Sequence, residues 1–151
     1  MSNFYFLSDY LEERGSLTYA NVGTSMMPLL REGIDLFTVK KKGKERFKRG
    51  DVVLYHRTPD KYVLHRIIEV TDDDYVIMGD NTVSKEVGIK DDEILGIMIG
   101  YTRNGRYHST DEIGYRLYTA YILRTIKLRV FLKRSLFLIK VLIQRVMNEK
   151  Q

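Results

Sequence analysis

The sequence predicts a mainly β fold with flanking helices. Between residues 17 and 110, short segments rich in β-branched and aromatic residues alternate with turn signals, which is typical of antiparallel strands. Residues 3–14 carry apolar side chains at helical spacing, and residues 113–148 contain no proline and are expected to be helical. At 151 residues and 44% hydrophobic content, the chain is long enough for one domain with a hydrophobic core.

The first expected element is a short amphipathic helix within an N-terminal segment at 1–16. Phe4, Leu7 and Leu11 recur at the spacing of one helix face, and Gly15 is a suitable stop. The segment has no basic start, and acidic residues soon interrupt its apolar positions. We therefore do not expect a secretory signal peptide.

A β-domain is expected at 17–112. Turns at "RTPDK" (57–61), "TDDD" (71–74) and "NG" (104–105) separate its strands. The predicted strands are "LTYANV" (17–22), "IDLFTV" (34–39), "DVVLYH" (51–56), "YVLHRIIEV" (62–70), "YVIMG" (75–79) and "ILGIMIGYT" (94–102).

The remaining segment, 113–151, is a basic amphipathic tail. Residues 114–151 carry nine Lys/Arg and one acid, whereas residues 1–113 carry 16 basic and 19 acidic residues, so the tail accounts for the net charge of +5. Within it, residues 115–147 contain eight basic residues, no acid and no run of 18 apolar residues, so no clear transmembrane span is expected.

We expect residues 115–147 to bind an anionic membrane surface without crossing it, which predicts a peripheral membrane-associated or cytoplasmic protein. On a helical wheel the charges fall into two groups on roughly opposite sides. The alternative is therefore that the helix packs one face on the β-core or on a second subunit. Nucleic acid is not expected as a partner, because the tail is as apolar as it is basic.

The composition excludes several kinds of chemistry. The chain has no cysteine, which rules out disulfides, a thiol nucleophile and cysteine-ligated zinc. Its three histidines, His56, His65 and His108, do not have the spacing of a helical zinc site. We expect neither a metal nor a cofactor.

The segment "GTSMMPLL" (23–30) places the Ser25 hydroxyl in an apolar run. A buried hydroxyl without a partner costs about 1–3 kcal/mol. Ser25 therefore either bonds to nearby backbone at a strand start or acts as a nucleophile in a dry groove.

A nucleophilic serine needs a base. His65 lies in a strongly strand-like segment, and strict alternation places Val63, His65 and Ile67 on one face. His65 is either a satisfied core residue or a general base for Ser25. Lys61 projects to the same side, and a buried lysine with a lowered pKa is an alternative base.

A carboxylate beyond His65 would complete a triad. The segment "MGDN" (78–81) is a turn by composition. Its Asp80, or Glu86 shortly after, supplies an acid to orient His65 and stabilise its charged form. The residues alone leave this choice open.

Together these segments resemble a known family. The succession of "GTSMMPLL", "KRGDVVLY" (48–55), "YVLHRII" (62–68) and "GDN" (79–81) resembles the boxes of type I signal peptidases, in the superfamily that also contains LexA-type self-cleaving repressors. The resemblance covers about residues 20–100. It implies a coiled antiparallel β-sheet core and a serine endopeptidase that cleaves an extended segment of a protein or peptide precursor, such as a signal or leader peptide.

The resemblance also implies residue roles. Ser25 matches the nucleophile, and His65 falls where the Ser–His branch of the family carries its general base. Asp80 matches the aspartate of the G-D-N box. Glu86 is the only acid in the stretch where that branch carries a further triad acid. Burial would keep His65 neutral at working pH.

Met26, Met27 and Pro28 are expected, by the same resemblance, to line the substrate groove. The backbone N–H of the nucleophile would contribute to the oxyanion hole. Many members add the hydroxyl of a serine two residues earlier, where this chain has Gly23. Another donor would have to replace it.

The chain also departs from the family. Typical members have a transmembrane helix just before the serine box, and residues 1–24 contain no such segment. Two other functions are a non-catalytic membrane-surface binding module on the same fold and a LexA-type self-cleaving regulator. An intact Ser25 and His65 argue against the first, and the 24 residues before Ser25 are too few for the DNA-binding domain of the second.

Overall fold

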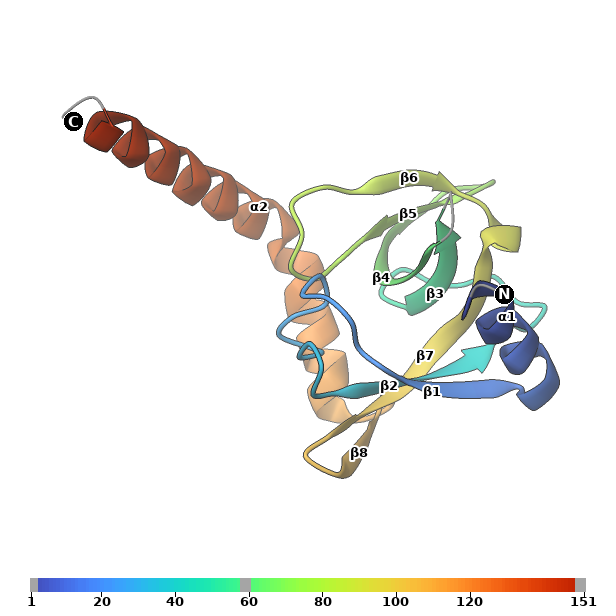
Figure 1. The fold of residues 1–151 in the computed structure, drawn as a ribbon. Coiled ribbons are helices and arrows are strands. Elements are labelled where there is room, and N and C mark those ends of the chain that lie inside the picture. Colours follow the sequence, from blue (N-terminus) through green and yellow to red (C-terminus); the bar gives the residue numbers. More distant parts are fainter. Residues whose placement is uncertain (1–2, 58–60, 149–151) are drawn as a thin grey trace.

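The computed structural model describes residues 3–57 and 61–148 (Figure 1). Its elements are α1 (Asn3–Arg14), β1 (Ser16–Ala20), β2 (Leu36–Lys41), β3 (Val52–Arg57), β4 (Lys61–Val70), β5 (Tyr75–Met78), β6 (Glu86–Ile89), the 3-10 helix η1 (Asp91–Glu93), β7 (Ile94–Arg103), β8 (Arg106–Ser109) and α2 (Ile113–Asn148).

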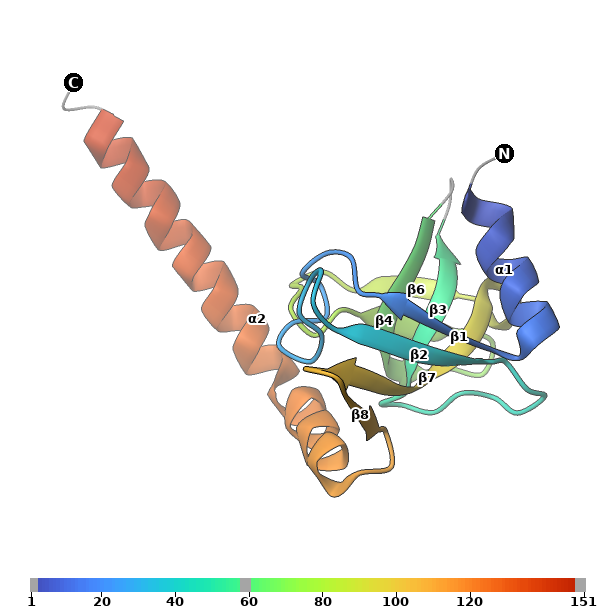
Figure 2. The same ribbon diagram turned by 60° about the horizontal axis from the view of Figure 1, so that its bottom comes forward.

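The described strands form one antiparallel eight-stranded sheet in the order β1-β2-β7-β3-β4-β5-β6, with β8 paired to β7. Register shifts interrupt the β2–β7, β3–β7 and β4–β5 pairs. Such irregularities increase the local twist, and the sheet curls strongly (Figure 2). The predicted mainly β class with flanking helices is confirmed.

Both faces of the central strand β3 are buried. Val52 and Leu54 belong to one core cluster, together with Leu11 of α1, whereas Val53 and Tyr55 belong to a second cluster. Full burial of a large apolar side chain contributes about 1.5–3 kcal/mol, so these two clusters supply the main stabilisation of the sheet.

Helix α1 covers one end of the sheet (Figures 1 and 2). Leu11 is buried in the first cluster and Leu7 packs against it, as the helical spacing predicted, while the Phe4 side chain lies outside the described part. The helix ends at Gly15, whose positive φ of 73° lets its N–H donate to the Leu11 carbonyl at 3.0 Å.

Two of the three predicted turns are confirmed. At 71–74, the Thr71 N–H donates to the Asp74 carbonyl at 3.0 Å between β4 and β5. Asn104 and Gly105 both have positive φ, which closes the tight β7–β8 hairpin. The third turn, around 58–60, lies outside the described residues.

The 36-residue helix α2 has two distinct halves. Near its start, Tyr115 and Tyr118 pack against the first core cluster and Ile122 is buried. From Leu136 onward every described residue is exposed, and this part projects away from the sheet (Figures 1 and 2). Across residues 3–57 and 61–148, we find no helix whose length and apolar character would let it cross a membrane.

Candidate active site

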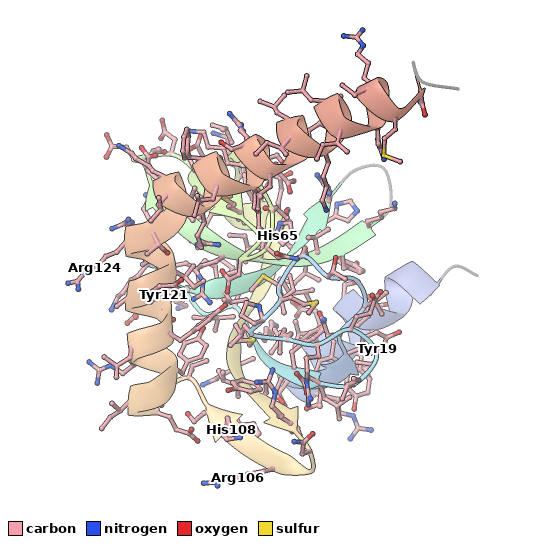
Figure 3. The ribbon with its side chains drawn as sticks, turned by 90° about the vertical axis from the view of Figure 1, so that its left-hand side faces the viewer. Tyr19, His65, Arg106, His108, Tyr121 and Arg124 are labelled. Carbon is pink, nitrogen blue, oxygen red and sulfur yellow. The ribbon has the colours of Figure 1, made fainter. Side chains whose placement is uncertain are left out.

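A cavity of about 560 Å³ lies between the edge strand β1, strand β4 and the segment that leads into β6. Ser25, His65 and Glu86 all line it, although they come from three separate parts of the chain. Figure 3 shows His65 inside the β body, whereas Tyr121 and Arg124 lie on α2 outside it. The curl of the sheet brings these three side chains to one space.

Ser25 lies in the loop between β1 and β2. Within the described part of the chain, its hydroxyl forms no hydrogen bond, and no buried side-chain polar atom is left without a partner. The half-buried Ser25 hydroxyl is therefore open to the cavity, and it does not bond to nearby backbone as the simpler interpretation required.

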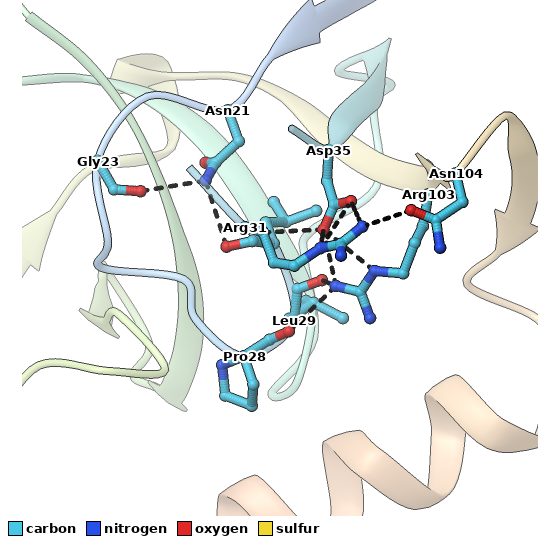
Figure 4. A network of polar contacts seen from close by, with 9 residues as sticks. Asn21, Gly23, Pro28, Leu29, Arg31, Asp35, Arg103 and Asn104 are labelled. Atoms are coloured by element: carbon cyan, nitrogen blue, oxygen red, sulfur yellow. Dashed lines mark hydrogen bonds and ion pairs between the residues drawn. The ribbon is translucent and has the colours of Figure 1, made fainter. Parts of the chain in front are cut away.

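The loop that carries Ser25 is anchored by a buried acid (Figure 4). Asp35 accepts hydrogen bonds from Arg31 at 2.8 Å and from Arg103 at 2.7 Å, and Arg103 also donates to the Leu29 carbonyl at 2.9 Å. Although burial acts to raise it, these arginines hold the pKa of Asp35 well below its usual range. The loop is thus fixed to β7 at its far end.

His65 faces two oxygen atoms across its Nδ1. The Tyr55 hydroxyl lies 3.3 Å from Nδ1 and Glu86 Oε1 lies 3.5 Å from it. The same hydroxyl donates its proton to Glu86 Oε1 at 2.8 Å. Both atoms facing Nδ1 are therefore acceptors, which assigns the proton to Nδ1 and leaves Nε2 as the free base.

The protonation state of His65 follows from its surroundings. Burial lowers the pKa of His65 below its ordinary value and Arg57 adds to this effect, against the opposing charges of Glu86 and Asp80. His65 is therefore neutral at neutral pH, which is the state that a general base needs.

Gly79 lies next to both the Ser25 carbonyl and His65 Nε2. A Cβ atom at Gly79 would lie 2.7 Å from the Ser25 carbonyl oxygen and 3.0 Å from His65 Nε2. The absence of a side chain at this position thus allows both groups to approach. No hydrogen bond joins Ser25 Oγ to Nε2 among the described residues, and such bonds often form only once a substrate is bound.

Glu86 and Asp80, the two acids that the sequence left open, have different environments. Glu86 is half-buried at the start of β6, and its other oxygen lies 3.1 Å from Arg57 Nε. Asp80 is buried, and its two oxygens each accept a bond from Arg66 at 2.8 Å. Tyr118 of α2 also donates to Asp80, at 3.0 Å. The structure thus brings Glu86, and not the Asp80 carboxylate, to within 3.5 Å of His65 Nδ1.

The three residues expected to line the substrate groove do not line this cavity. Met26 is buried in the first core cluster, Met27 and Pro28 are exposed, and none of the three is among the described residues that line the cavity. The chain turns after Ser25, where the Leu30 N–H donates to the Met26 carbonyl at 3.0 Å, and the Met26 side chain faces the core. The apolar lining of the cavity is instead Leu7, Tyr19, Ala20, Val22, Phe37, Leu54, Tyr62, Val63 and Leu64.

Two residues next to the site were not predicted from the sequence. Tyr55 contacts both His65 and Glu86, and Arg57 pairs with Glu86. Both lie on β3, where Tyr55 fits the pattern of a core aromatic and Arg57 that of a strand end. No signal in the sequence distinguishes them from ordinary strand residues.

Comparisons with known proteins give no relationship for this chain: no family model, curated protein or solved structure matches it.

Proposed function

We propose that this protein is a serine endopeptidase in which Ser25 is the nucleophile, His65 the general base and Glu86 the acid that orients His65. One observation carries the proposal: a free serine hydroxyl and a neutral histidine backed by a carboxylate line the same cavity. The curled antiparallel sheet and the order of the motifs further support a fold of the signal peptidase and LexA type.

The proposed reaction is an acyl transfer. Ser25 Oγ attacks the carbonyl carbon of the scissile peptide bond while His65 Nε2 takes the hydroxyl proton, and Glu86 stabilises the resulting imidazolium. The Ser25 N–H, which donates to no acceptor among the described residues, would bind the oxyanion. The imidazolium then returns its proton to the leaving amine, and water hydrolyses the acyl-enzyme by the same route.

The shape of the cavity favours an extended peptide as substrate. β1 is an edge strand, and residues 19–22 line the cavity together with Thr82, Ser84 and Glu86. An extended segment can add to such an edge through main-chain hydrogen bonds, with its side chains in the apolar lining. This arrangement suits a segment of a precursor, including a signal or leader peptide.

The test is to incubate the purified protein with a proteome-derived peptide library and to identify new termini by mass spectrometry. The wild type and the exposed-site control Ser16→Ala are expected to cut the same peptides. Ser25→Ala is expected to lose several orders of magnitude in rate. Cleavage by Ser25→Ala at more than about a tenth of the wild-type rate would contradict the assignment, because loss of a true nucleophile costs far more.

We also propose that residues 134–147 of α2, which include the projecting part from Leu136 onward, contact an anionic membrane surface. It carries three basic residues and no acid, and its large apolar side chains are exposed all round. The sequence predicted membrane contact over residues 115–147. Because the first half of α2 packs on the sheet, we limit the proposed membrane-binding surface to residues 134–147. Peptidase and membrane contact are compatible, because the cavity and the projecting helix are separate features.

A further inference from the structure

We infer that Arg129 and Lys133 of α2 are positioning residues for Ser25. They donate hydrogen bonds to the turn at 79–81, and residues of this turn donate hydrogen bonds to the loop that carries Ser25. The inference rests on the proposed role of Ser25 as nucleophile, and it gives α2 a part in catalysis that is independent of any membrane contact.

The first link joins α2 to the turn. Lys133 Nζ donates to the Asn81 carbonyl at 2.6 Å and also to Asn81 Oδ1, and Arg129 donates to the Asp80 carbonyl. Partial burial, helped by the charge of Arg129, lowers the pKa of Lys133. Arg129 and Lys133, one helical turn apart, thus donate to the successive backbone carbonyls of residues 80 and 81.

The second link joins the turn to the Ser25 loop. Asn81 N–H donates to the Ser25 carbonyl at 2.7 Å, and Asn81 Nδ2 donates to the Thr24 carbonyl at 3.0 Å. A lysine ammonium can only donate, so Lys133 fixes which end of the Asn81 amide is its oxygen. The NH2 end then necessarily faces Thr24, and the orientation of this amide depends on Lys133.

The same turn also reaches the base. Gly79 lies against both the Ser25 carbonyl and His65 Nε2, and the Asp80 side chain is fixed by the buried Arg66 next to His65. A displacement of the turn would therefore move the nucleophile relative to the base. Elsewhere in this loop, the Gly23 N–H donates to Glu32 Oε1 at 2.9 Å and Asn21 Nδ2 donates to the Gly23 carbonyl at 3.1 Å.

The charge pattern of α2 agrees with this role. The basic residues of α2 form two groups on roughly opposite sides of the helix. One group contains Arg129 and Lys133, and the other contains Arg124 and Lys127. Arg124 and Lys127 are exposed, and Arg124 lies on the side of α2 away from the sheet (Figure 3). The inward charges therefore have a partner in the turn, and the outward charges provide a matched control.

The experiment uses the full-length protein with Lys133→Met, Lys133→Arg and the control Lys127→Met, which removes the same charge from an exposed position of the same helix. The first readout is hydrogen exchange of the Asn81 amide, which reports its bond to the Ser25 carbonyl. The second is kcat and KM for the best-cleaved peptide of the library. Asn81→Ala removes the side-chain bonds of Asn81 to Lys133 and to the Thr24 carbonyl, and it serves as a second variant if Lys133→Met fails to fold.

For Lys133→Met we expect faster exchange of the Asn81 amide and a kcat about ten- to a hundredfold lower, because small misplacements of reacting groups are costly. KM should stay within about twofold, since the binding cavity is intact. Lys133→Arg should recover most of kcat because it restores a donor, and Lys127→Met should match the wild type. A merely structural role would instead lower the unfolding midpoint without this split between kcat and KM.

Two results would overturn the inference: wild-type exchange and kcat in Lys133→Met, or an equal loss of kcat in Lys127→Met. The exchange readout does not depend on cleavage. The wild type could cleave no peptide while Lys133→Met still speeds hydrogen exchange of the Asn81 amide. In that case the proposed peptidase function fails, but the link from α2 to the Ser25 loop is supported.

Discussion

At the scale of single residues, the burial of His65 determines how activity should depend on pH. Burial lowers the pKa of His65, so the neutral base persists below the ordinary histidine pKa. Activity is expected to be full above about pH 6.5 and to be lost as the pH falls through the lower pKa of the folded protein. Stability should fall in the same direction, because the unfolded chain takes up the proton first on acidification.

The measurement is kcat/KM against pH for the wild type and Lys61→Ala. Lys61 begins β4 and also lines the cavity, but its side chain is exposed, whereas His65 is buried and has Nε2 next to Gly79 and the Ser25 carbonyl. We therefore expect Lys61→Ala to keep the wild-type profile and His65→Ala to be inactive. An active His65→Ala together with an inactive Lys61→Ala would identify a Ser–Lys enzyme instead.

Gly79 gives a second prediction at this scale. In Gly79→Ala, the added Cβ would lie 2.7 Å from a backbone oxygen of Ser25, which has to move. We expect cleavage to fall about a hundredfold, because the nucleophile is displaced from His65. Overpacking of this kind costs about 1–3 kcal/mol in stability, so the protein should remain folded.

Gly43→Ala is the matched control, because a Cβ atom there meets nothing within 4 Å. Cleavage rate and thermal unfolding of both variants provide the measurement. Wild-type cleavage by Gly79→Ala would show that Ser25 and His65 do not need their close approach at this glycine.

At the scale of elements, the sequence predicted the strands that carry strong apolar patterns and missed those that do not. β6 and β8 are four residues each, and β6 begins at the charged Glu86. The pairing of Glu86 with Ile77 across β5 and β6 is what brings this acid to His65. Because β6 has no pattern of its own, the choice between Asp80 and Glu86 depended on tertiary structure.

The serine loop shows the same limit. Ser25 and His65 were identified as candidates from the order of their motifs, and they do line one cavity. The inward direction of Met26 depends on the turn that follows Ser25. An apolar run alone does not show whether its side chains face a groove or the core. The roles of Tyr55 and Arg57 likewise come from strand pairing.

Asp80 and Glu86 lie in different elements, and we expect their substitution to have different effects. Asp80 links β4 to α2 through Arg66 and Tyr118, so Asp80→Asn leaves a buried arginine without its countercharge. Removal of one partner of a buried pair costs about 3–5 kcal/mol. We expect Asp80→Asn to be strongly destabilised in urea unfolding.

Glu86→Gln should behave in the opposite way. Glu86 is half-buried at the cavity, so its amide variant should fold normally but lose at least about a hundredfold in kcat, because the imidazolium loses its stabilising charge. Normal cleavage by Glu86→Gln, or a stable Asp80→Asn without activity, would reverse the roles of these two acids.

At the scale of the whole molecule, α2 divides its length between two environments. Its first half completes the structure around Asp80 and the core, and its second half extends beyond the sheet with apolar side chains exposed on every side. The sequence showed two groups of charges on the helix but could not show that one group faces the turn at 79–81. Which part of α2 packs on the sheet and which part projects depends on where along the helix the sheet ends.

The last prediction concerns the projecting part of α2. Residues 134–147 combine Arg134, Lys140 and Arg145 with exposed side chains such as Phe137, which suits a position at a membrane interface. A central Lys or Arg costs about 2.5–3.5 kcal/mol on insertion scales, which opposes spanning. At an anionic surface each basic residue contributes about 1 kcal/mol, so reversal of all three should weaken binding by at least about a hundredfold.

The measurement is co-sedimentation with phosphatidylglycerol-containing vesicles at low salt, where surface charges are least screened. The full-length protein is compared with a triple variant, R134E/K140E/R145E, and with a control that makes the same charge change on exposed residues of the β body, K40E/K44E/K48E. We expect the wild type and the control to sediment with anionic vesicles and the helix variant to stay in solution. If the wild type stays in solution, or if the control loses as much binding as the helix variant, the projecting helix does not hold the protein at an anionic membrane, and its exposed apolar side chains require a protein partner instead.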